Sequence, residues 1–255
     1  MKLTFIGNGN MAKALIKGLV SNYTIEVLGR NKQSLEKLKE ELPEISVKII
    51  SDNESISDKN IVLCVKPYSL GDLSPKLSGS ANCVYSVLAG TSINSLKAQI
   101  KASAYVRTMP NLGASYQKSM TTLTGDIELK DSALNIFNNI GTSLWLSSEN
   151  ELDIATGIAG SGPAYLALIA ESLADGGVKA GLKREDSQAI VAGLFDSFAP
   201  LIQNENPAHI KDGVMSSGGT TAAGYATLEK CNVRNAMIES VQSAYSKALE
   251  LKQKN

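Results

Sequence analysis

The sequence of 255 residues contains a single histidine, and this scarcity excludes two large groups of active sites. His209 lies in a polar segment that we expect to be a connection, so one chain can build neither an imidazole triad nor a site with several histidine ligands. Cys64, Cys83 and Cys231 are far apart and lack the spacing of metal ligands. Cys64 and Cys83 lie in apolar runs, where a thiol most often packs as a small core side chain. We therefore expect no metal site, and any catalysis must depend on chemistry other than that of imidazole.

The sequence also lacks an excess of charge of either sign, since 25 basic residues balance 25 acidic ones. This balance indicates neither a nucleic acid nor a membrane surface as partner. No apolar run approaches the roughly 18 residues that a membrane-spanning helix needs. The first apolar stretch reaches Gly7 too early for the core of a signal peptide. A hydrophobic fraction of 43% fits an ordinary globular protein, which we expect to be cytoplasmic.

Residues 1–148 alternate between short apolar runs of strand-like spacing and segments of helical spacing. Strands separated by helices predict βαβ units with right-handed crossovers and a parallel sheet. We therefore predict an α/β fold whose N-terminal half is a Rossmann-type doubly wound sheet. Strands are expected at residues 3–6, 24–28, 47–50, 61–65 and 84–88, with extensions of one edge at 104–107, 120–123 and 143–146, and helices at 11–20, 35–42 and 93–100.

Residues 149–255 show helical periodicity and no convincing strand, which predicts a second, all-α domain after a boundary near residue 148. A long helix is expected from Pro163 to the glycine pair at 176–177, followed by helices at 190–201 and 233–251. Proline suits the first position of a helix, because its ring fixes φ and its missing N–H is not needed there.

The expected helices of the second domain carry broad apolar faces. A helical layer of this size has little interior in which to bury such side chains, and a second copy of the chain buries them through a symmetric interface. We therefore expect dimerisation through this domain and leave a larger homo-oligomer open; the alternative is an unusually wide internal core. The apolar side chains concerned are Leu166, Leu173, Leu194, Phe195 and Phe198.

A glycine-rich segment follows the first expected strand and opens the first expected helix. It fits the dinucleotide-binding pattern G-x-G-x-x-G/A. The first glycine permits the tight turn, the second lets a pyrophosphate approach, and the last small residue allows close contact between helix and sheet. Because the match lies inside a βαβ unit, it predicts that residues 1–148 bind a dinucleotide. The six residues are Gly7, Asn8, Gly9, Asn10, Met11 and Ala12.

The end of the second expected strand indicates which dinucleotide binds. Enzymes that use NAD usually have an Asp or Glu there, which hydrogen-bonds the ribose hydroxyls. This chain has Arg30 and Asn31 instead. A guanidinium suits the 2′-phosphate of NADPH through charge-assisted hydrogen bonds. We therefore expect NADPH, with NADH as an open second cofactor; the alternative is that Arg30 and Lys32 only solvate the start of a helix.

Three further segments are expected to line the same crevice, because the carboxyl ends of the strands face the ligand in a doubly wound sheet. One follows the third expected strand and is placed at the adenosine end. The other two follow the fourth and fifth strands, and the lysine among them either contacts a phosphate or remains an exposed charge. The residues are Asn53, Val65, Lys66, Pro67, Ala89 and Gly90.

A second glycine-rich run lies near the C-terminus and leads directly into a segment of helical spacing. Paired glycines let the backbone approach a ligand, and the first turn of a helix has unpaired N–H groups that suit a small anion such as a carboxylate. The simpler alternative is a Ser/Thr cap after a glycine turn. The run consists of Ser216, Ser217, Gly218, Gly219, Thr220 and Thr221.

Together these segments resemble the pyrroline-5-carboxylate reductase family, whose members complete proline biosynthesis. The likeness extends over nearly the whole chain, its motifs occur in the family's order, and the last glycine-rich run is the family's most specific signature. The matching segments are residues 7–12, 65–67, 106–111, 160–165, 173–178, 181–182, 211–212, 214, 216–221 and 228–229.

The resemblance implies NADPH-dependent reduction of a cyclic imino acid, 1-pyrroline-5-carboxylate, to L-proline. It implies that the backbone amides of Gly219, Thr220 and Thr221, with the Ser216 hydroxyl, hold the substrate carboxylate. It also implies that Thr221 is the catalytic residue that contacts the ring nitrogen, while its role as a proton donor stays open. Three departures from the family pattern affect how rigid the pocket is: Ser217 in place of Pro, Leu112-Gly113 in place of Thr-Pro, and Tyr68 in place of Gln.

Two alternative functions stay open. One is a reductase of the same two-domain plan that acts on another imine or on a small hydroxy or keto acid. Many hydroxy-acid enzymes use a lysine in the body of a helix, whereas Lys179 and Lys183 follow the expected end of the long helix. The other is a catalytically silent NADP-binding regulatory protein, which would have no need of a carboxylate-binding turn.

Overall fold

The computed structural model describes residues 1–254, which divide into two compact units. The first unit comprises Met1–Ser161 together with Val241–Asn255, and the second comprises Gly162–Ser240. This division differs from the predicted boundary near residue 148, because the last helix of the chain returns to the first unit. The assignment of residues 149–255 as a functional domain therefore stays a prediction.

The described residues of the first unit form one large sheet with the strand order β10-β9-β8-β7-β5-β1-β2-β3. Its neighbouring strands are parallel except β8 and β9, which are antiparallel. The predicted doubly wound sheet is confirmed, but β9 and β10 run against the other six strands. The strands are β1 Lys2–Ile6, β2 Thr24–Gly29, β3 Ser46–Ile49, β5 Asn60–Leu63, β7 Ala81–Ser86, β8 Ala102–Met109, β9 Ser119–Gly125 and β10 Gly141–Trp145, and β4 Glu54–Ser55 and β6 Leu77–Ser78 form a separate pair.

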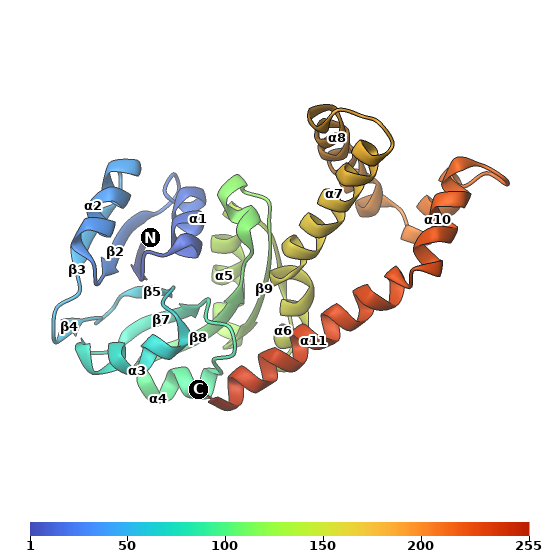
Figure 1. Ribbon diagram of the computed structural model, residues 1–255. Helices are drawn as coiled ribbons and strands as arrows, with labels where there is room; N and C mark the ends of the chain where they lie inside the picture. The colour runs from blue at the N-terminus through green and yellow to red at the C-terminus, as the bar shows by residue number, and fades with distance from the viewer. Residues whose placement is uncertain (255) are drawn as a thin grey trace. The chain divides into compact units, whose positions relative to one another are not determined.

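Helices cover both faces of this sheet, because alternate residues of its strands point to opposite sides. In β1, Leu3 and Phe5 join one apolar cluster and Ile6 joins another. Complete burial of a side chain such as Phe5 stabilises the fold by about 1.5–3 kcal/mol. Figure 1 shows α1, α2 and α5 on one side of the sheet and α3 and α4 on the other. These helices are α1 Asn10–Leu19, α2 Lys32–Glu41, α3 Leu70–Leu73, α4 Ile93–Gln99 and α5 Lys130–Phe137.

The strand order reverses direction at β1, which pairs with β2 on one side and with β5 on the other. From β1 the chain continues outward through β2 to β3, and then returns to build β5, β7 and β8 on the opposite side. The loops that follow β1 and β5 therefore leave the sheet in opposite directions and open a crevice at its carboxyl edge.

The rest of the chain is helical, as predicted, but three details differ. The long helix continues through Gly176 and Gly177 to Lys179, and the segment around His209 is a helix rather than a connection. The helix predicted at 190–201 is longer, since it begins at Arg184 and ends at Asn204. The elements are α6 Glu149–Ala155, a π-helical turn Thr156–Gly160, α7 Gly162–Lys179, α8 Arg184–Asn204, α9 Pro207–Val214, α10 Thr220–Lys230 and α11 Val233–Lys254.

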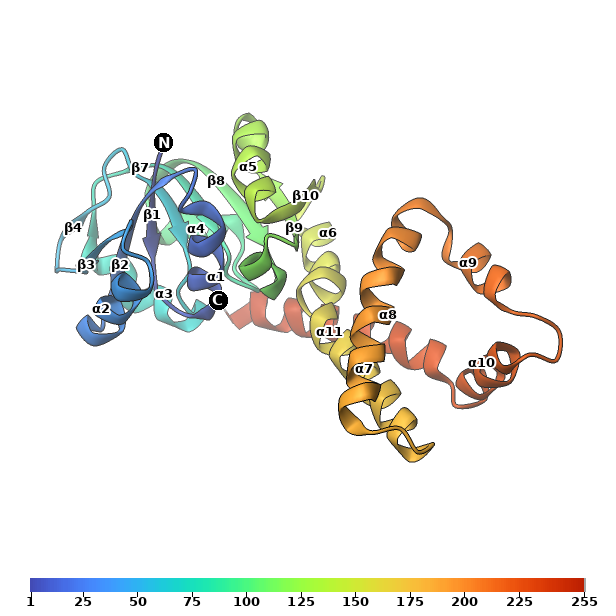
Figure 2. The same ribbon diagram turned by 90° about the horizontal axis from the view of Figure 1, so that it is seen from above.

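Gly177 in α7 serves packing rather than helix termination, whereas a Cβ atom at Gly176 would have no atom within 4 Å. Helices α7 and α8 lie side by side (Figures 1 and 2), and the Ser187 hydroxyl of α8 donates to the Ala174 carbonyl at 2.7 Å. A Cβ atom at Gly177 would collide with the Ser187 hydroxyl. A residue without a side chain is therefore needed where the two helices approach closely. This gain outweighs the cost of glycine in a helix, which is about 1 kcal/mol relative to alanine.

The second unit buries few of its described residues, namely Ala174, Ser187 and Val191. The predicted exposure of an apolar face is confirmed, although Phe195 is partly buried. So much uncovered apolar surface is unusual for a protein that remains monomeric. The exposed fractions are 50% for Leu166, 46% for Leu173, 51% for Leu194 and 39% for Phe198.

The stretch Glu149–Lys179 also has the length and composition of a membrane-spanning helix, which the sequence analysis did not anticipate. Its mean hydropathy reaches 1.3 in its most apolar window, and 17% of that window is buried. Length and composition alone are weak evidence for a membrane, because helices that pack in a core pass the same test. An apolar helix in an oligomer interface has the same properties.

Candidate functional site

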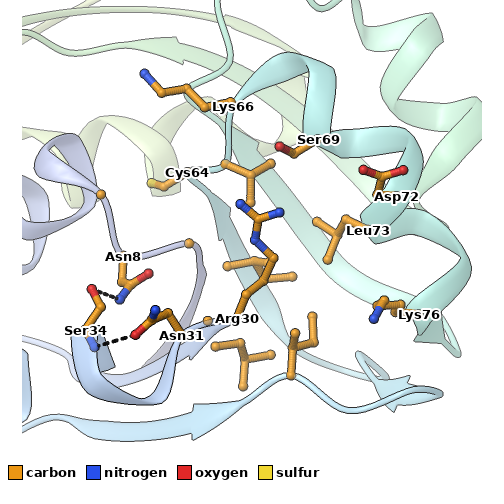
Figure 3. A pocket seen from close by; sticks show the side chains of 17 residues that line it. Asn8, Arg30, Asn31, Ser34, Cys64, Lys66, Ser69, Asp72, Leu73 and Lys76 are labelled. Carbon is orange, nitrogen blue, oxygen red and sulfur yellow. Dashed lines mark hydrogen bonds between the residues drawn. The ribbon is translucent and has the colours of Figure 1, made fainter. Parts of the chain in front are cut away.

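A cavity of about 510 Å³ lies at the carboxyl ends of β1, β2 and β5 (Figure 3). Three loops supply its walls: the turn from β1 to α1, the turn from β2 to α2, and the segment that follows β5. The cavity thus occupies the place where the strand order reverses, as ligand sites in doubly wound sheets do. Of the residues that sequence analysis assigned to the cofactor, seven line it: Gly7, Asn8, Gly9, Arg30, Asn31, Val65 and Lys66.

The turn from β1 to α1 has glycine at positions 7 and 9 for different structural reasons. Gly7 has φ +107°, and a Cβ atom there would lie 2.7 Å from the Cys64 carbonyl oxygen. The close approach of the turn to the segment after β5 therefore requires glycine. Gly9 caps the start of α1, and a Cβ atom there would have no atom within 4 Å. A side chain at Gly9 would extend over the first amides of α1, which are the natural partners of a pyrophosphate.

The other three residues of the pattern support α1 rather than line the cavity. Ala12 is fully buried in the apolar cluster between α1 and the sheet, and Met11 is partly buried against it. Asn10 is the exposed first residue of the helix. A small residue at position 12 thus lets α1 pack closely on the sheet and direct its amino end toward the cavity.

The turn after β2 presents a group of hydrogen-bond donors. The Arg30 guanidinium extends into the cavity in Figure 3. Asn31 caps α2 by accepting from the Ser34 amide at 2.9 Å, and the Asn8 side-chain amide donates to the Ser34 hydroxyl at 2.9 Å. Because the Ser34 oxygen accepts from Asn8, its own proton is free to bind an anion. Sequence analysis missed Ser34, although its place in the first turn of a capped helix beside Arg30 was a usable signal.

The opposite wall comes from the short helical segments after β5, which sequence analysis did not assign to the site. Pro67 begins a 3-10 turn, Pro67–Ser69, and does not itself line the cavity. The lining residues that follow are spaced i, i+3, i+4 and i+7, so they lie on one helical face. That spacing could have identified them in the sequence. They are Ser69, Asp72, Leu73 and Lys76.

Cys64 also lines the cavity, but it is not a nucleophile. The thiol lies where the turn of Gly7 meets the segment after β5. Burial raises the pKa of the Cys64 thiol well above its usual value. The thiol is therefore neutral at physiological pH, and it acts as a small packing group at the base of the site.

Besides Asn10, Met11, Ala12 and Pro67, three further residues assigned to the cofactor do not line this cavity. Asn53 has φ +64°, and its carbonyl accepts from the Ser78 hydroxyl at 3.1 Å. Ala89 and Gly90 lie in the loop after β7, where a Cβ atom at Gly90 would be 2.6 Å from the Cβ of Leu251. Their roles in cofactor binding stay predictions.

The cavity fits a dinucleotide with a phosphate on its adenosine ribose. Its base is a tight glycine turn at the start of a helix, which suits a pyrophosphate. At the end of β2, where an NAD site has a carboxylate, the structure has the guanidinium of Arg30 beside the hydroxyl of Ser34. Lys66 and Lys76 also line the cavity, together with the carboxylate of Asp72, and Lys76 pairs with Asp52 at 3.3 Å. The donors of Arg30 and Ser34 match the acceptor oxygens of phosphate groups.

The second glycine-rich run forms the turn between α9 and α10, in the second unit. Gly218 has φ +71°, a conformation that favours glycine, and the Gly219 amide donates to the Ser216 carbonyl at 3.0 Å. A Cβ atom at Gly219 would collide with the Ser216 hydroxyl. Thr220 begins α10, and the amides of its first turn have no partner inside the helix. Thr221 is half-buried in this turn, which is suited to bind a small carboxylate.

Ion pairs surround this turn and connect α9, α10 and α11. The Lys211 ammonium lies 2.7 Å from Asp212 and 5.7 Å from the ring centre of Tyr225. The Arg234 guanidinium donates to the Tyr225 hydroxyl at 2.6 Å and pairs with Glu229, where its hydrogen bond lowers the pKa of that carboxyl. Because these side chains are largely exposed, each pair is screened by water and contributes little to stability.

The three departures from the family pattern have exposed side chains. Tyr68 is 80% exposed and Leu112 is 61% exposed, so neither disturbs the core. Gly113 lies in a tight 3-10 turn, where a Cβ atom would be 2.7 Å from the Lys118 carbonyl oxygen. Ser217 is exposed at the turn itself. In the described part of the chain, no cluster of three or more His, Cys, Asp or Glu side chains has the arrangement of a metal site.

Comparison with known proteins links both halves of the chain to one kind of enzyme. A family model described as "Pyrroline-5-carboxylate reductase dimerisation" matches residues 149–251, and one described as "NADP oxidoreductase coenzyme F420-dependent" matches residues 2–90. The pyrroline-5-carboxylate reductase of Synechocystis sp. is 36% identical and covers 100% of this chain and 99% of its own.

Solved structures show the same likeness. The 1-pyrroline-5-carboxylate reductase of Streptococcus pyogenes superposes with a TM-score of 0.87 at 27% identity and covers 98% of both chains. The pyrroline carboxylate reductase of Plasmodium falciparum, solved with NADP bound, has a TM-score of 0.83 at 27% identity and covers 99% of this chain and 98% of its own.

Proposed function

Because the chain belongs to the pyrroline-5-carboxylate reductase family, we propose that it reduces 1-pyrroline-5-carboxylate to L-proline with NADPH. The observation that carries the proposal is the turn at Ser216–Thr221, which the chain combines with a dinucleotide cavity lined by Arg30. A reductase of a cyclic imino acid needs both a carboxylate site and a hydride donor. A regulatory protein that only binds NADP would need the cavity alone.

The mechanism assigns binding and orientation to the protein and the redox chemistry to the cofactor. When bound, NADPH supplies a hydride to the imine carbon, so that the C=N bond becomes a C–N bond and NADP⁺ is left. Arg30 and Ser34 hold the adenosine phosphate, and the first amides of α1 hold the pyrophosphate. The amides of Thr220 and Thr221 hold the substrate carboxylate. The Gly219 amide, expected from the sequence to take part as well, instead donates to the Ser216 carbonyl at 3.0 Å and shapes the turn.

The nitrogen of the ring needs one proton during the reaction. An imine that enters protonated already carries it and is already electrophilic, so a histidine base is unnecessary. The Thr221 hydroxyl contacts this nitrogen and orients the ring. Much of the rate enhancement then comes from holding the reacting carbons in a near-attack arrangement, which supplies up to about 7–11 kcal/mol in favourable cases.

A direct test follows the absorbance of NADPH with purified protein and three additions: the cyclic imine, an open-chain keto acid, or no substrate. We expect NADPH to be consumed only with the cyclic imine. Consumption that is as fast with the keto acid would favour a different reductase of the same fold. Binding of NADPH without consumption in any mixture would favour a regulatory protein.

The exposed apolar side chains of α7 and α8 support a homo-oligomer that assembles through the helical domain. We propose that the smallest stable form is a homodimer, since a symmetric pair covers these faces with one kind of interface. We also place the enzyme in the cytoplasm, in agreement with its balanced charge of 25 basic and 25 acidic residues.

A further inference from the structure

The C-terminal end of α11 packs against the loop that follows β7. Gly90, in this loop, has φ +66°, and a Cβ atom there would lie 2.6 Å from the Cβ of Leu251 and 3.2 Å from its carbonyl carbon. Figure 1 shows the last turns of α11 beside α4, which begins just after this loop. Backbone contact this close allows the end of α11 to fix where Gly90 lies.

The loop after β7 ends at residues 92–93, and this end is held by a series of charged groups. The Ile93 amide donates to a Glu149 carboxylate oxygen at 2.8 Å, and the Arg107 guanidinium donates to the same oxygen at 3.1 Å. Arg107 also donates to Asp153 at 2.7 Å. The other oxygen of Asp153 accepts from the Lys252 ammonium at 3.2 Å. The contacts that start at Ile93 therefore return to α11, next to Leu251.

The centre of this network of hydrogen bonds and ion pairs is buried, and burial makes it rigid. The side chains of Arg107 and Asp153 are each 1% exposed, so their ion pair is shielded from water. Removal of one partner of such a pair is costly, because a charge is then left buried without compensation. The side chain of Lys252 is 30% exposed and lies at the end of this network that solvent reaches. When Lys252 is changed, Arg107 continues to compensate the charge of Asp153.

The segment held in this way lies at the edge of the sheet where the cofactor binds. Strand β7 runs parallel to β5, and the Val87 amide donates to the Leu63 carbonyl at 3.1 Å. The residues after β5 line the cavity, so the loop after β7 leaves the sheet at the same edge. Thr91, in the middle of this loop, is 1% exposed.

We propose that the end of α11 clamps residues 90–93 and thereby positions the cofactor, with Leu251 and Lys252 as positioning residues. The inference rests on the proposed function, because it takes the loop after β7 as part of the NADPH site. A loop that is already ordered costs less conformational entropy on binding. Release of the clamp therefore lowers the affinity for NADPH and has little influence on the carboxylate site in the second unit.

The test compares three variants of the full-length protein by calorimetric titration with NADPH. Lys252→Ala is expected to raise the Kd of NADPH about 3-fold or more, the range typical of residues that act through others. Lys247→Ala is the matched control, since this exposed lysine lies on the same helix and forms an ion pair with Glu250 at 2.7 Å. It should bind NADPH as the wild type does. Lys252→Arg keeps the charge and should restore most of the affinity.

A second readout separates positioning from general loss of stability. Hydrogen exchange of the amides at residues 88–93 should accelerate in Lys252→Ala, while exchange in β1 and β5 stays unchanged. The KM of NADPH should rise in parallel with its Kd, and the KM of the imine should not. If Lys252→Ala does not fold, Leu251→Gly tests the same clamp from its other contact, because it removes the Cβ that lies closest to Gly90.

The inference is overturned if Lys252→Ala binds NADPH as tightly as the wild type, or if Lys247→Ala weakens it equally. Because binding is measured without turnover, failure of the clamp is distinct from failure of the proposed function. A wild type that binds NADPH but does not reduce the imine contradicts the function alone, whereas an active enzyme with an unchanged Kd in Lys252→Ala contradicts the clamp alone.

Discussion

We propose that the choice between NADPH and NADH depends on the charge that Arg30 brings to the cavity. Arg30 stands where an NAD site has a carboxylate, and the adjacent Ser34 hydroxyl is oriented by Asn8. Both groups suit the 2′-phosphate, which NADH lacks. Since the rest of the cavity contacts parts that the two cofactors share, a change at Arg30 should separate their affinities.

Arg30→Ala is expected to raise the Kd of NADPH about 10-fold or more, because a charge-assisted contact with a phosphate is lost. NADH should bind nearly as it does to the wild type. Titration calorimetry with both cofactors measures the difference. Lys32→Ala is the control, since Lys32 lies two residues away but pairs with Glu36 on the surface of α2, at 3.7 Å. An equal loss of affinity for both cofactors in Arg30→Ala would show that Arg30 does not bind the 2′-phosphate.

Thr221→Ala should lower kcat about 10-fold or more while the Kd of NADPH stays close to the wild-type value, because the lost contact is to the reacting ring. Thr221→Ser keeps the hydroxyl and should retain most of the activity. Thr227→Ala is a matched control in the same helix, since the Thr227 hydroxyl donates only to the Ala223 carbonyl, at 3.1 Å. Turnover that is unchanged in Thr221→Ala would remove the residue from the catalytic machinery.

At the scale of elements, the small pair of strands β4 and β6 depends on a buried acid. Glu54 is 3% exposed, and its two carboxylate oxygens each accept from the Lys48 ammonium at 2.7 Å. The Ser51 hydroxyl donates to the same carboxylate at 2.8 Å. Burial alone would raise the pKa of Glu54, but the hydrogen bonds from Lys48 and Ser51 lower it below the ordinary value of 4.5.

Glu54→Gln is expected to reduce the free energy of unfolding at pH 7 by about 1–3 kcal/mol, because Lys48 and Ser51 lose a charged acceptor. A lowered pKa in the folded state means that the contribution of Glu54 is complete above its unfolded value of 4.5 and is lost as the pH falls through the folded value. The difference between variant and wild type should therefore shrink in acid. Urea unfolding at pH 7 and at a pH below the folded pKa of Glu54 measures this difference. Glu36→Gln, at an exposed glutamate, is the control. A difference that grows in acid would contradict this account.

The sequence predicts those elements whose signals are local. The alternation of apolar residues in β1 and the glycine pattern at residues 7–12 are such signals, and both correspond to the structure. The helix through Gly177 was mispredicted because its cause is contact with Ser187, which lies on another helix. The opposite direction of β9 likewise depends on a partner strand and has no mark in its own residues.

The same distinction holds for the site. Residues on the turns after β1 and β2 were predictable, because the rule that strand ends face the ligand places them without any knowledge of packing. The wall from Ser69 to Lys76 belongs to helical segments of only three or four residues, whose spacing is a weaker signal in the sequence than that of a long helix. The contact of Arg107 with Asp153 joins residues 46 positions apart, and no spacing in the sequence announces it.

At the scale of the whole molecule, the apolar faces of α7 and α8 require a partner. Light scattering coupled to size-exclusion chromatography should give a mass of at least twice the 27.0 kDa of one chain. Phe198→Asp places a charge on the exposed apolar face and should shift the protein toward the monomer, since burial of an unpaired charge in an interface is costly. A stable wild-type monomer of 27.0 kDa would contradict assembly through this domain.

The central claim is that the protein transfers a hydride from NADPH to the imine carbon of 1-pyrroline-5-carboxylate. Isotope transfer tests it most directly: the enzyme is supplied with the imine and with NADPH in which both hydrogens of the reactive nicotinamide carbon are replaced by deuterium, and the product is examined by mass spectrometry. The account predicts L-proline with one deuterium on the ring carbon that lies next to nitrogen and bears no carboxylate. Proline without deuterium at that carbon, or no proline at all, would contradict it.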